Sequence, residues 1–265
     1  MDFLAKIVAH KLEESRRLFE SGVAEEFKAA IAVRPAPLSL KAALARRAGR
    51  AIIAEVKRAS PSKGEFAMGW DPVELAKIYQ GNGAVAISVL TERAFFKGDP
   101  DFIRRMRPEI SLPILRKDFI LEPIQVYETA ALGADALLLL ARLLNLGQLL
   151  ALLLLTRSLG MEALVEVHTR EEMQTALAAG AKLIGINHRD LQTFELDMHR
   201  ALDLAPLAPP DVTLVAASGL KTPADLERLE QGGIHAFLIG ETLVTQSDPG
   251  RKLWEFIGAY KPDIA

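Results

Sequence analysis

The chain has 265 residues, half of them apolar, and its 32 basic and 34 acidic side chains give a formal net charge of −2. This length suits one large α/β domain or two small ones, and the balanced charge argues against a nucleic-acid surface or a polybasic membrane anchor. Because cysteine is absent, disulfides, thiolate chemistry and cysteine metal sites are excluded.

Residues 1–48 are predicted to form a helical extension that packs on the main domain. Apolar residues recur there at helical spacing between charged residues, namely at Leu4, Ile7, Val8, Leu12 and Leu18. A second helix is predicted over 40–48, after the proline-containing stretch 34–37. The frequent charges near the N-terminus differ from a secretory signal, so we expect a cytoplasmic protein.

From residue 51 onward, strand-like and helix-like stretches alternate. The apolar runs predicted as strands are 51–57, 84–90, 113–118, 135–141, 162–167, 182–187, 212–217 and 235–240. The predicted helices are 72–81, 99–107, 122–132, 145–159, 169–179, 197–205, 222–231 and 248–259. Capping residues mark helix starts at Asp71, Asp99, Thr169 and Thr222, and glycines mark helix ends at 83, 133, 160, 180 and 233.

This alternation predicts a parallel sheet covered by helices. Eight such units after residue 50 match a (β/α)₈ TIM barrel, which typically needs ~250 residues. The alternative, a doubly wound open sheet, would normally carry a glycine-rich turn after its first strand, and residues 58–62 contain no glycine. We therefore predict one α/β barrel domain over 1–265, of which 1–48 is an N-terminal helical extension.

The leucine-rich stretch 136–155 has nearly the length of a membrane-spanning helix. Arg142, Asn145, Gly147 and Gln148 lie in its middle, and a central arginine alone costs about 3 kcal/mol on insertion scales. The stretch is better explained by a buried strand over 135–141 and a following helix that Asn145 caps. A membrane helix is therefore the least favoured alternative.

Charged side chains occur at the predicted C-terminal ends of several strands, where the active site of a TIM barrel lies. Glu55 and Lys57 are two residues apart, so both point to the same side of the first strand. The third strand delivers Lys117 and the fifth delivers Glu166. One ion pair can simply fill a barrel end, but two amines and two carboxylates from three strands are hard to explain as packing. The cluster predicts acid–base chemistry.

Small residues end the seventh and eighth strands, Ser218 with Gly219 and Gly240 with Glu241, just before helices. Backbone N–H groups are accessible at such positions, and TIM barrels often bind phosphate there. The residues alone therefore predict an enzyme acting on a phosphorylated small molecule, without naming that molecule. The apolar residues Phe96, Phe119 and Leu138 can line its pocket or be ordinary core.

The histidines give no sign of a metal site. They lie at His10, His168, His188, His199 and His235, and no two form an HxxxH-type pair. Each is expected to be a surface residue or a satisfied core residue.

The chain resembles the indole-3-glycerol phosphate synthase family of tryptophan biosynthesis. The resembling segments follow one another over the whole barrel, at 53–62, 90–92 with Phe96, 113–119, Glu166, 185–190, 217–219 and 238–240. The helical extension is also typical of that family. The resemblance implies ring closure of 1-(2-carboxyphenylamino)-1-deoxyribulose 5-phosphate with loss of carbon dioxide and water, and it implies no metal or organic cofactor. We expect no nucleic-acid or membrane partner, and a monomer or weak homo-oligomer.

Residue roles also follow from this resemblance. Lys117 matches the general acid that protonates the substrate carbonyl, and Glu166 matches a partner in later proton transfers, notably dehydration. Lys57 matches a residue that neutralises substrate charge, while Glu55 and Asn187 match residues that hold hydroxyl groups. Substrate, anthranilate-ring and phosphate contacts are implied for Ser60, Phe96, Phe119, Leu138, Arg189, Ser218, Gly219, Gly240 and Glu241.

Two points about the site remain open from the sequence. Many family members carry glutamate before the Ser-Gly of strand seven, and Ala217 here puts an auxiliary carboxylate in doubt. Partial desolvation can lower a lysine pKa toward the working pH, which would make Lys117 a useful acid.

Two functions are alternatives to the synthase. One is a phosphosugar aldolase or isomerase in which Lys117 forms a Schiff base, and the other is a barrel kept only for binding. The binding-only alternative would be expected to lack one of the four charged residues, and all are present.

Overall fold

Eight parallel strands form a closed barrel at the centre of the molecule. The computed structural model describes residues 3–45, 50–60, 63–66 and 68–258. Its barrel runs in the order β1-β10-β9-β8-β7-β6-β5-β4, and every neighbouring pair is parallel. The strands are β1 (Ala51–Val56), β4 (Ala86–Leu90), β5 (Ile114–Lys117), β6 (Ala136–Leu140), β7 (Glu162–Val167), β8 (Leu183–Asn187), β9 (Thr213–Ala217) and β10 (Ala236–Ile239). The predicted TIM barrel is confirmed.

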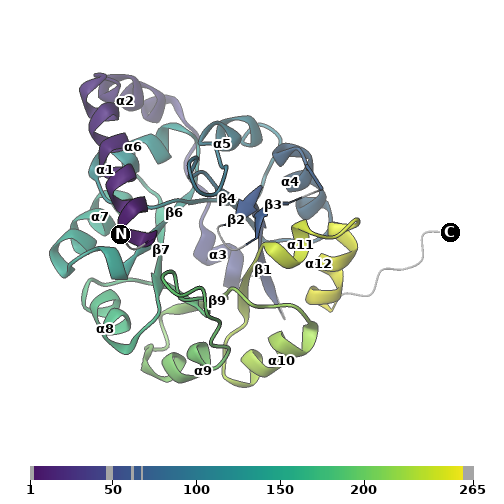
Figure 1. The fold of residues 1–265 in the computed structure, drawn as a ribbon. Coiled ribbons are helices and arrows are strands. Elements are labelled where there is room, and N and C mark those ends of the chain that lie inside the picture. The colour runs from purple at the N-terminus through teal and green to yellow at the C-terminus, as the bar shows by residue number, and fades with distance from the viewer. Residues whose placement is uncertain (1–2, 46–49, 61–62, 67, 259–265) are drawn as a thin grey trace.

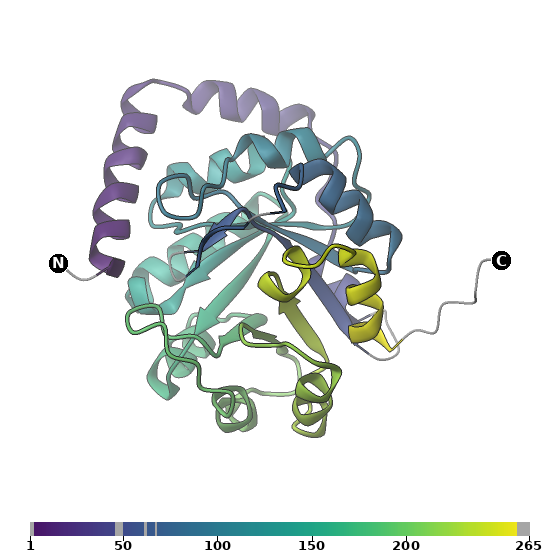
Figure 2. The ribbon, with the colours of Figure 1, turned by 45° about the vertical axis from the view of Figure 1, so that its right-hand side comes forward.

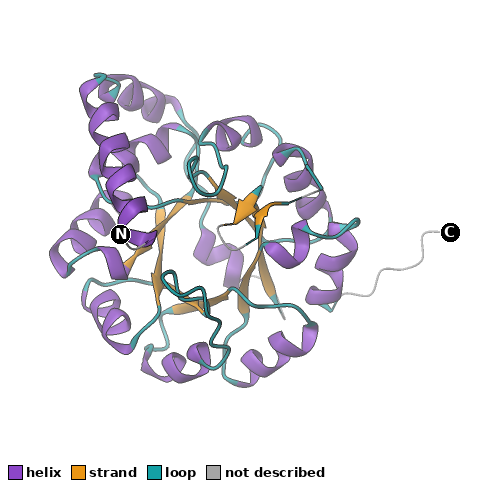
Figure 3. Ribbon diagram, in the orientation of Figure 1, coloured by secondary structure: helices purple, strands orange, loops and turns teal. Residues whose placement is uncertain are grey.

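Helices surround this ring of strands, as Figure 3 shows. They are α4 (Pro72–Gly81), α5 (Asp101–Met106), α6 (Pro123–Ala131), α7 (Leu146–Ser158), α8 (Arg170–Ala178), α9 (Arg200–Leu204), α10 (Pro223–Gln231), α11 (Glu241–Val244) and α12 (Pro249–Ile257). Side chains of Asp71, Thr169 and Thr222 accept backbone hydrogen bonds at the starts of α4, α8 and α10, as predicted. The short helix α11 was not predicted, and residue 259 of the last predicted helix lies outside the described residues.

The leucine-rich stretch divides as predicted into a strand, β6, and a helix, α7. The 3₁₀ turn over Ala141–Leu143 between them was not predicted. Asn145 caps α7 by accepting a hydrogen bond from the Gln148 N–H at 3.0 Å, and the Gln148 side chain accepts one in return. None of the helices in the described part of the chain combines the length and apolar character that a membrane crossing requires.

Three helices precede the first strand and wrap around the barrel. They are α1 (Phe3–Glu20), α2 (Ala24–Val33) and α3 (Leu40–Ala45), of which α2 was not predicted. Figures 1 and 2 show α1 and α2 beside the barrel wall near α6, and α3 beneath the ring of strands. Backbone N–H groups of Leu38 and Lys41 donate to Asp135 and Glu162, which lie at the N-terminal ends of β6 and β7. Residues 46–48 of the predicted second helix lie outside the described residues.

The buried face of α1 differs from the apolar residues that predicted the helix. It contains Leu4 and Ile7 but continues with Lys11 and Ser15, whereas Leu12 is 43% exposed. The ammonium group of Lys11 lies 3.0 Å from a carboxylate oxygen of Asp118, directly after β5. The extension is therefore held to the strand that carries Lys117 by a buried ion pair.

A two-stranded antiparallel sheet, β2 (Ala59–Ser60) and β3 (Gly64–Glu65), follows the first barrel strand. These two strands were not predicted, because two-residue strands show no measurable periodicity in a sequence. The pairing of Ser60 with Gly64 turns the chain back over the end of β1. Ser60 is thereby placed at the mouth of the barrel.

Candidate active site

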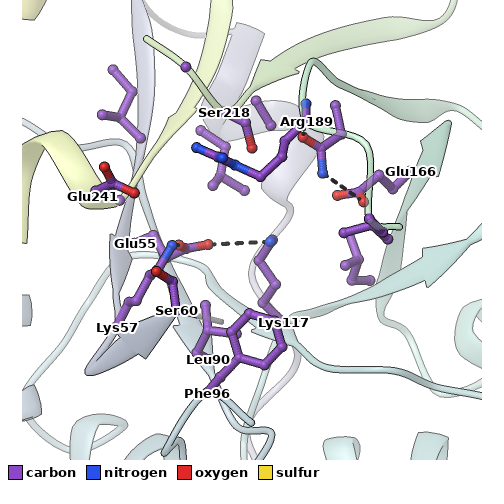
Figure 4. A pocket seen from close by; sticks show the side chains of 18 of the residues that line it. Glu55, Lys57, Ser60, Leu90, Phe96, Lys117, Glu166, Arg189, Ser218 and Glu241 are labelled. Carbon is purple, nitrogen blue, oxygen red and sulfur yellow. Dashed lines mark hydrogen bonds and ion pairs between the residues drawn. The ribbon is translucent and has the colours of Figure 1, made fainter. Parts of the chain in front are cut away.

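One pocket at the C-terminal ends of the barrel strands is lined by every residue that the sequence predicted for the site. These residues are Glu55, Lys57, Ser60, Phe96, Lys117, Phe119, Leu138, Glu166, Asn187, Arg189, Ser218, Gly219, Gly240 and Glu241. Figure 4 shows the labelled charged side chains directed into the same space from different strands. The alternation of side chains along each strand explains this convergence, because residues two apart share the inner face.

The carboxylate of Glu55 lies between two ammonium groups. Its Oε1 is 3.5 Å from Nζ of Lys57, and its Oε2 is 3.5 Å from Nζ of Lys117. Figure 4 marks the contact with Lys117 across the pocket. The Oε2 atom is buried and has no hydrogen-bond partner among the described residues. This oxygen therefore keeps hydrogen-bonding capacity beyond its ion pair with Lys117.

The charges around Lys117 set the direction of its pKa. Burial alone would lower the pKa of Lys117, but the carboxylates of Glu55 and Glu166 outweigh burial and raise it. The prediction that desolvation lowers this pKa was therefore wrong, because two carboxylates face the same ammonium group. Lys117 is held in its protonated form, which is the form that can donate a proton.

Glu166 is positioned by neighbouring strands. Its Oε1 accepts a hydrogen bond of 3.0 Å from Nδ2 of Asn187, at the end of β8. Oδ1 of Asn187 in turn accepts the backbone N–H of Arg189 at 3.0 Å, which fixes the amide orientation. The ring of His168 lies behind Glu166, with Nε2 3.7 Å from the same Oε1. Contrary to the expectation for a satisfied core histidine, neither ring nitrogen of His168 has a hydrogen-bond partner among the described residues.

The loop after β9 forms another side of the pocket. Ser218 and Gly219 both have positive φ, at 67° and 75°. Such a conformation is uncommon for serine, and Nδ1 of His188 supports it by donating to the Ser218 carbonyl oxygen at 2.9 Å. The positive φ favours glycine at position 219, and a Cβ atom there would lie 2.6 Å from the sulfur of Met198, so that flexible side chain would have to move.

Glu241, at the start of α11, brings a negative charge to this region. Its Oε1 lies 2.7 Å from Nζ of Lys63, which precedes β3. Burial would raise the pKa of Glu241, but the hydrogen bond from Lys63 and the charges of Lys57 and Arg189 outweigh burial and lower it. The sequence analysis did not identify Lys63, although it belongs to the same charged stretch as Glu55 and Lys57.

An apolar wall closes the remaining side of the pocket. The rings of Phe96 and Phe119 lie 6.0 Å apart at 38°, and Leu138 lines the pocket near its base. Phe3 from α1 also lines the pocket and contacts Phe95 and Phe194, with ring centroids 5.4 and 5.3 Å away. The remaining lining residues that sequence reasoning missed include Leu4, Ile7, Leu191, Phe194 and Lys221.

Three further observations describe the chemistry of the pocket. Oγ of Ser60 is buried and has no hydrogen-bond partner among the described residues, so it can donate to a bound molecule. Ala217 lines the pocket and supplies no charge. Within the residues that the structure describes, no group of three or more histidine, aspartate or glutamate side chains is arranged to hold a metal ion.

Known proteins match the chain over most of its length. The family model described as indole-3-glycerol phosphate synthase matches residues 4–256. An indole-3-glycerol phosphate synthase from Carboxydothermus hydrogenoformans is 50% identical over 221 residues, covering 82% of this chain and 84% of that protein. Another, from Desulforamulus reducens, is 44% identical over 257 residues and covers 97% of both chains.

Solved structures with the same architecture are more distant in sequence. A 3-hexulose-6-phosphate synthase superposes with a TM-score of 0.64 at 14% identity, covering 78% of this chain and 98% of that chain. A thiamine phosphate pyrophosphorylase from Pyrococcus furiosus gives a TM-score of 0.57 at 14% identity, with 78% and 93% covered. At such identities the likeness shows the shared barrel fold alone.

Proposed function

Because the chain belongs to the indole-3-glycerol phosphate synthase family, we propose that its pocket residues close the indole ring by general acid–base catalysis. The family consists of carboxy-lyases of tryptophan biosynthesis that use a phosphorylated small-molecule substrate. That substrate is 1-(2-carboxyphenylamino)-1-deoxyribulose 5-phosphate. The observation that carries the residue assignment is the convergence of Glu55, Lys57, Lys117 and Glu166 from three strands in one pocket.

Lys117 acts first, as the general acid. Its protonated ammonium donates a proton to the substrate carbonyl oxygen while the carboxylate-bearing ring carbon attacks the carbonyl carbon. The new carbon–carbon bond and the new hydroxyl group form together. Loss of carbon dioxide then restores the aromatic ring. The raised pKa of Lys117, caused by Glu55 and Glu166 against the effect of burial, keeps the ammonium protonated, so a proton is present at this position to be donated.

Glu166 serves the dehydration that follows. It moves a proton as the new hydroxyl departs as water, and Asn187 holds its carboxylate at 3.0 Å. Lys57 offsets substrate negative charge and assists these transfers. Glu55 and Asn187 hold substrate hydroxyls, which is supported by Oε2 of Glu55: it forms an ion pair with Lys117 but makes no hydrogen bond to a described residue. Because Ala217 carries no charge, the acid–base chemistry is assigned to Glu55, Lys57, Lys117 and Glu166.

The phosphate is proposed to lie against the ends of β9 and β10. Backbone N–H groups of Ser218, Gly219 and Gly240 provide donors there, and Arg189 provides a positive charge. A carboxylate repels phosphate, so Glu241 contributes its backbone N–H while Lys63 neutralises its side chain. Ser60 contacts the substrate carboxylate or phosphate. Phe96, Phe119 and Leu138 hold the anthranilate ring.

The assay that tests this function uses the purified full chain and the carboxyphenylamino-deoxyribulose phosphate. We expect formation of a fluorescent indole product without added metal, and the same rate in the presence of a chelator. Tight substrate binding with no turnover would instead favour a barrel kept for binding. A cytoplasmic location, the absence of nucleic-acid or membrane partners, and a monomeric or weakly oligomeric state stay predictions.

Gly240→Ala is expected to lower kcat about 10- to 100-fold. A Cβ atom at this position would lie 2.4 Å from Oε1 and 3.0 Å from Cβ of Glu55, so the carboxylate must move. Misplacement of a catalytic group by about 1 Å can cost 10²-fold in rate. The matched control is Gly81→Ala, where nothing lies within 4 Å of the added atom. Equal kcat values for the two variants would contradict the role given to Glu55.

A further inference from the structure

His168 is buried beside the pocket but does not line it. Its side chain is 1% exposed, and it follows β7 two residues after Glu166. Nε2 lies 3.7 Å from Oε1 of Glu166, and Nδ1 lies 3.4 Å from Oε2 of Glu172. Both nitrogens therefore face carboxylate oxygens, although neither makes a hydrogen bond to a described residue. A buried imidazole in this condition requires an explanation, because leaving a buried polar group without a hydrogen bond is destabilising.

The Glu172 side of the ring is rigidly held. Oε2 of Glu172 accepts the backbone N–H of His168 at 2.6 Å, and Oε1 accepts Nε of Arg142 at 3.1 Å. Both terminal nitrogens of Arg142 also lie 3.1 Å from Asp190. Two backbone N–H groups of the loop after β8 donate to Asp190, which keeps that loop connected to Arg142. The imidazole thus faces the Glu172 carboxylate, which Arg142 holds through its other oxygen.

The contact between the His168 ring and Glu166 is the one that can change during the reaction. Oε1 of Glu166 already accepts a hydrogen bond from Asn187, and His168 approaches that same oxygen. A neutral imidazole can donate at only one of its two nitrogens, whereas an imidazolium donates at both. In either form the ring lies between Glu166 and Glu172, and a small movement of Glu166 would complete the hydrogen bond to Nε2.

We propose that His168 is a positioning residue for Glu166: its imidazole, held between Glu172 and Oε1 of Glu166, directs the carboxylate's free oxygen toward the substrate. The inference rests on the proposed role of Glu166 in dehydration. His168 donates hydrogen bonds without exchanging a proton with the substrate. The charged groups facing this arrangement are Glu172 from α8, Arg142 behind Glu172, and Lys117 across the pocket from Glu166.

Two substitutions separate positioning from simple packing. His168→Leu removes both donors, and we expect kcat to fall about tenfold or more while KM stays within about twofold. His168→Gln keeps one neutral donor and is expected to recover part of that loss. The fall in kcat at nearly constant KM, together with this partial recovery, is the readout that a merely structural role of His168 would not give. His235→Gln, at an exposed position before β10, is the matched control and should leave both readouts unchanged.

A double-mutant cycle with Glu166→Gln completes the test. We expect His168→Leu to cost nothing further once Glu166 has lost its charge, because the two residues act as one unit. Full kcat in His168→Leu, or an additive loss in the double variant, would overturn the inference while the synthase function stands. Full activity of Glu166→Gln would overturn both assignments. If His168→Leu fails to fold by circular dichroism, His168→Gln and its double variant carry the same comparison.

Discussion

Replacing Lys117 with alanine is expected to lower kcat by about 10²–10⁴-fold, the range that a positioned general acid contributes. The ammonium group lies 3.5 Å from Glu55 and interacts with the charge of Glu166, so it holds the two carboxylates of the pocket in place. Its removal takes away the proton donor for ring closure. The apolar wall and the phosphate region remain, so substrate binding is expected to persist. Steady-state kinetics of indole fluorescence measure both effects.

The controls for this variant address folding and chemistry separately. Lys182→Ala removes an exposed lysine at the opposite end of the barrel, where Lys182 pairs with Asp211, and should keep full activity. The circular dichroism spectra of the wild type, Lys117→Ala and Lys182→Ala should be the same. Turnover by Lys117→Ala at the wild-type rate would refute the assignment. A lysine adduct trapped with borohydride in the wild type and lost in Lys117→Ala would instead favour a Schiff-base aldolase or isomerase.

The pH dependence follows from the raised pKa of Lys117. A raised pKa keeps the ammonium protonated to higher pH, so the proton donor is present below that pKa and is lost only as pH rises through it. The alkaline limb of kcat/KM, which reports the free enzyme, is therefore expected above the ordinary lysine value of about 10.4. A limb near pH 7 that disappears in Lys117→Ala would mean that burial outweighs the two carboxylates.

The barrel could be predicted from the sequence because its signals are local and repeated. Each strand is a short apolar run, and each helix start or end carries its own capping residue, as with Thr222 and Gly233. The helix α2 lacked such a signal, since none of its residues is fully buried and Val23 provides no side-chain cap. Lys11 shows the limit most clearly. A lysine on an amphipathic helix suggests a solvated face, and the local partner Glu14 gives no sign of burial; the distant partner Asp118 explains why Lys11 is buried.

The pocket was predictable for the same reason that the strands were. Period-two alternation places Glu55 and Lys57 on one face, and parallel strands bring their ends together. The contribution of Phe3 was not predictable, because helical spacing identifies an apolar face without indicating what that face covers. Nor could the sequence give the direction of the Lys117 pKa, which depends on the distances to two carboxylates on other strands.

Asp118→Ala is expected to destabilise the protein by about 3–5 kcal/mol, the cost of removing one partner from a buried ion pair. Asp118 lies 3.0 Å from Lys11 and 3.1 Å from Arg116, and it accepts a hydrogen bond of 2.6 Å from Thr91. Its loss leaves two buried cations with fewer partners and releases the N-terminal helix from β5. Urea denaturation followed by circular dichroism measures the change. Asp211→Ala, which breaks an exposed ion pair, is the control and should leave the urea midpoint nearly unchanged.

Acid titration separates the contribution of the Asp118 charge to stability from the contribution of its side-chain packing. Burial would raise the pKa of Asp118, but the charges of Arg116 and Lys11 and the Thr91 hydrogen bond lower it to about 2. A lowered folded-state pKa means that this stabilisation is complete above the ordinary aspartate value near 3.9 and is lost as pH falls through about 2. The shift corresponds to on the order of 2 kcal/mol. Asp118→Asn keeps the shape without the charge, so the stability difference between it and the wild type should shrink across this pH range. A constant difference would mean that packing around Asp118, rather than its charge, holds the extension to the barrel.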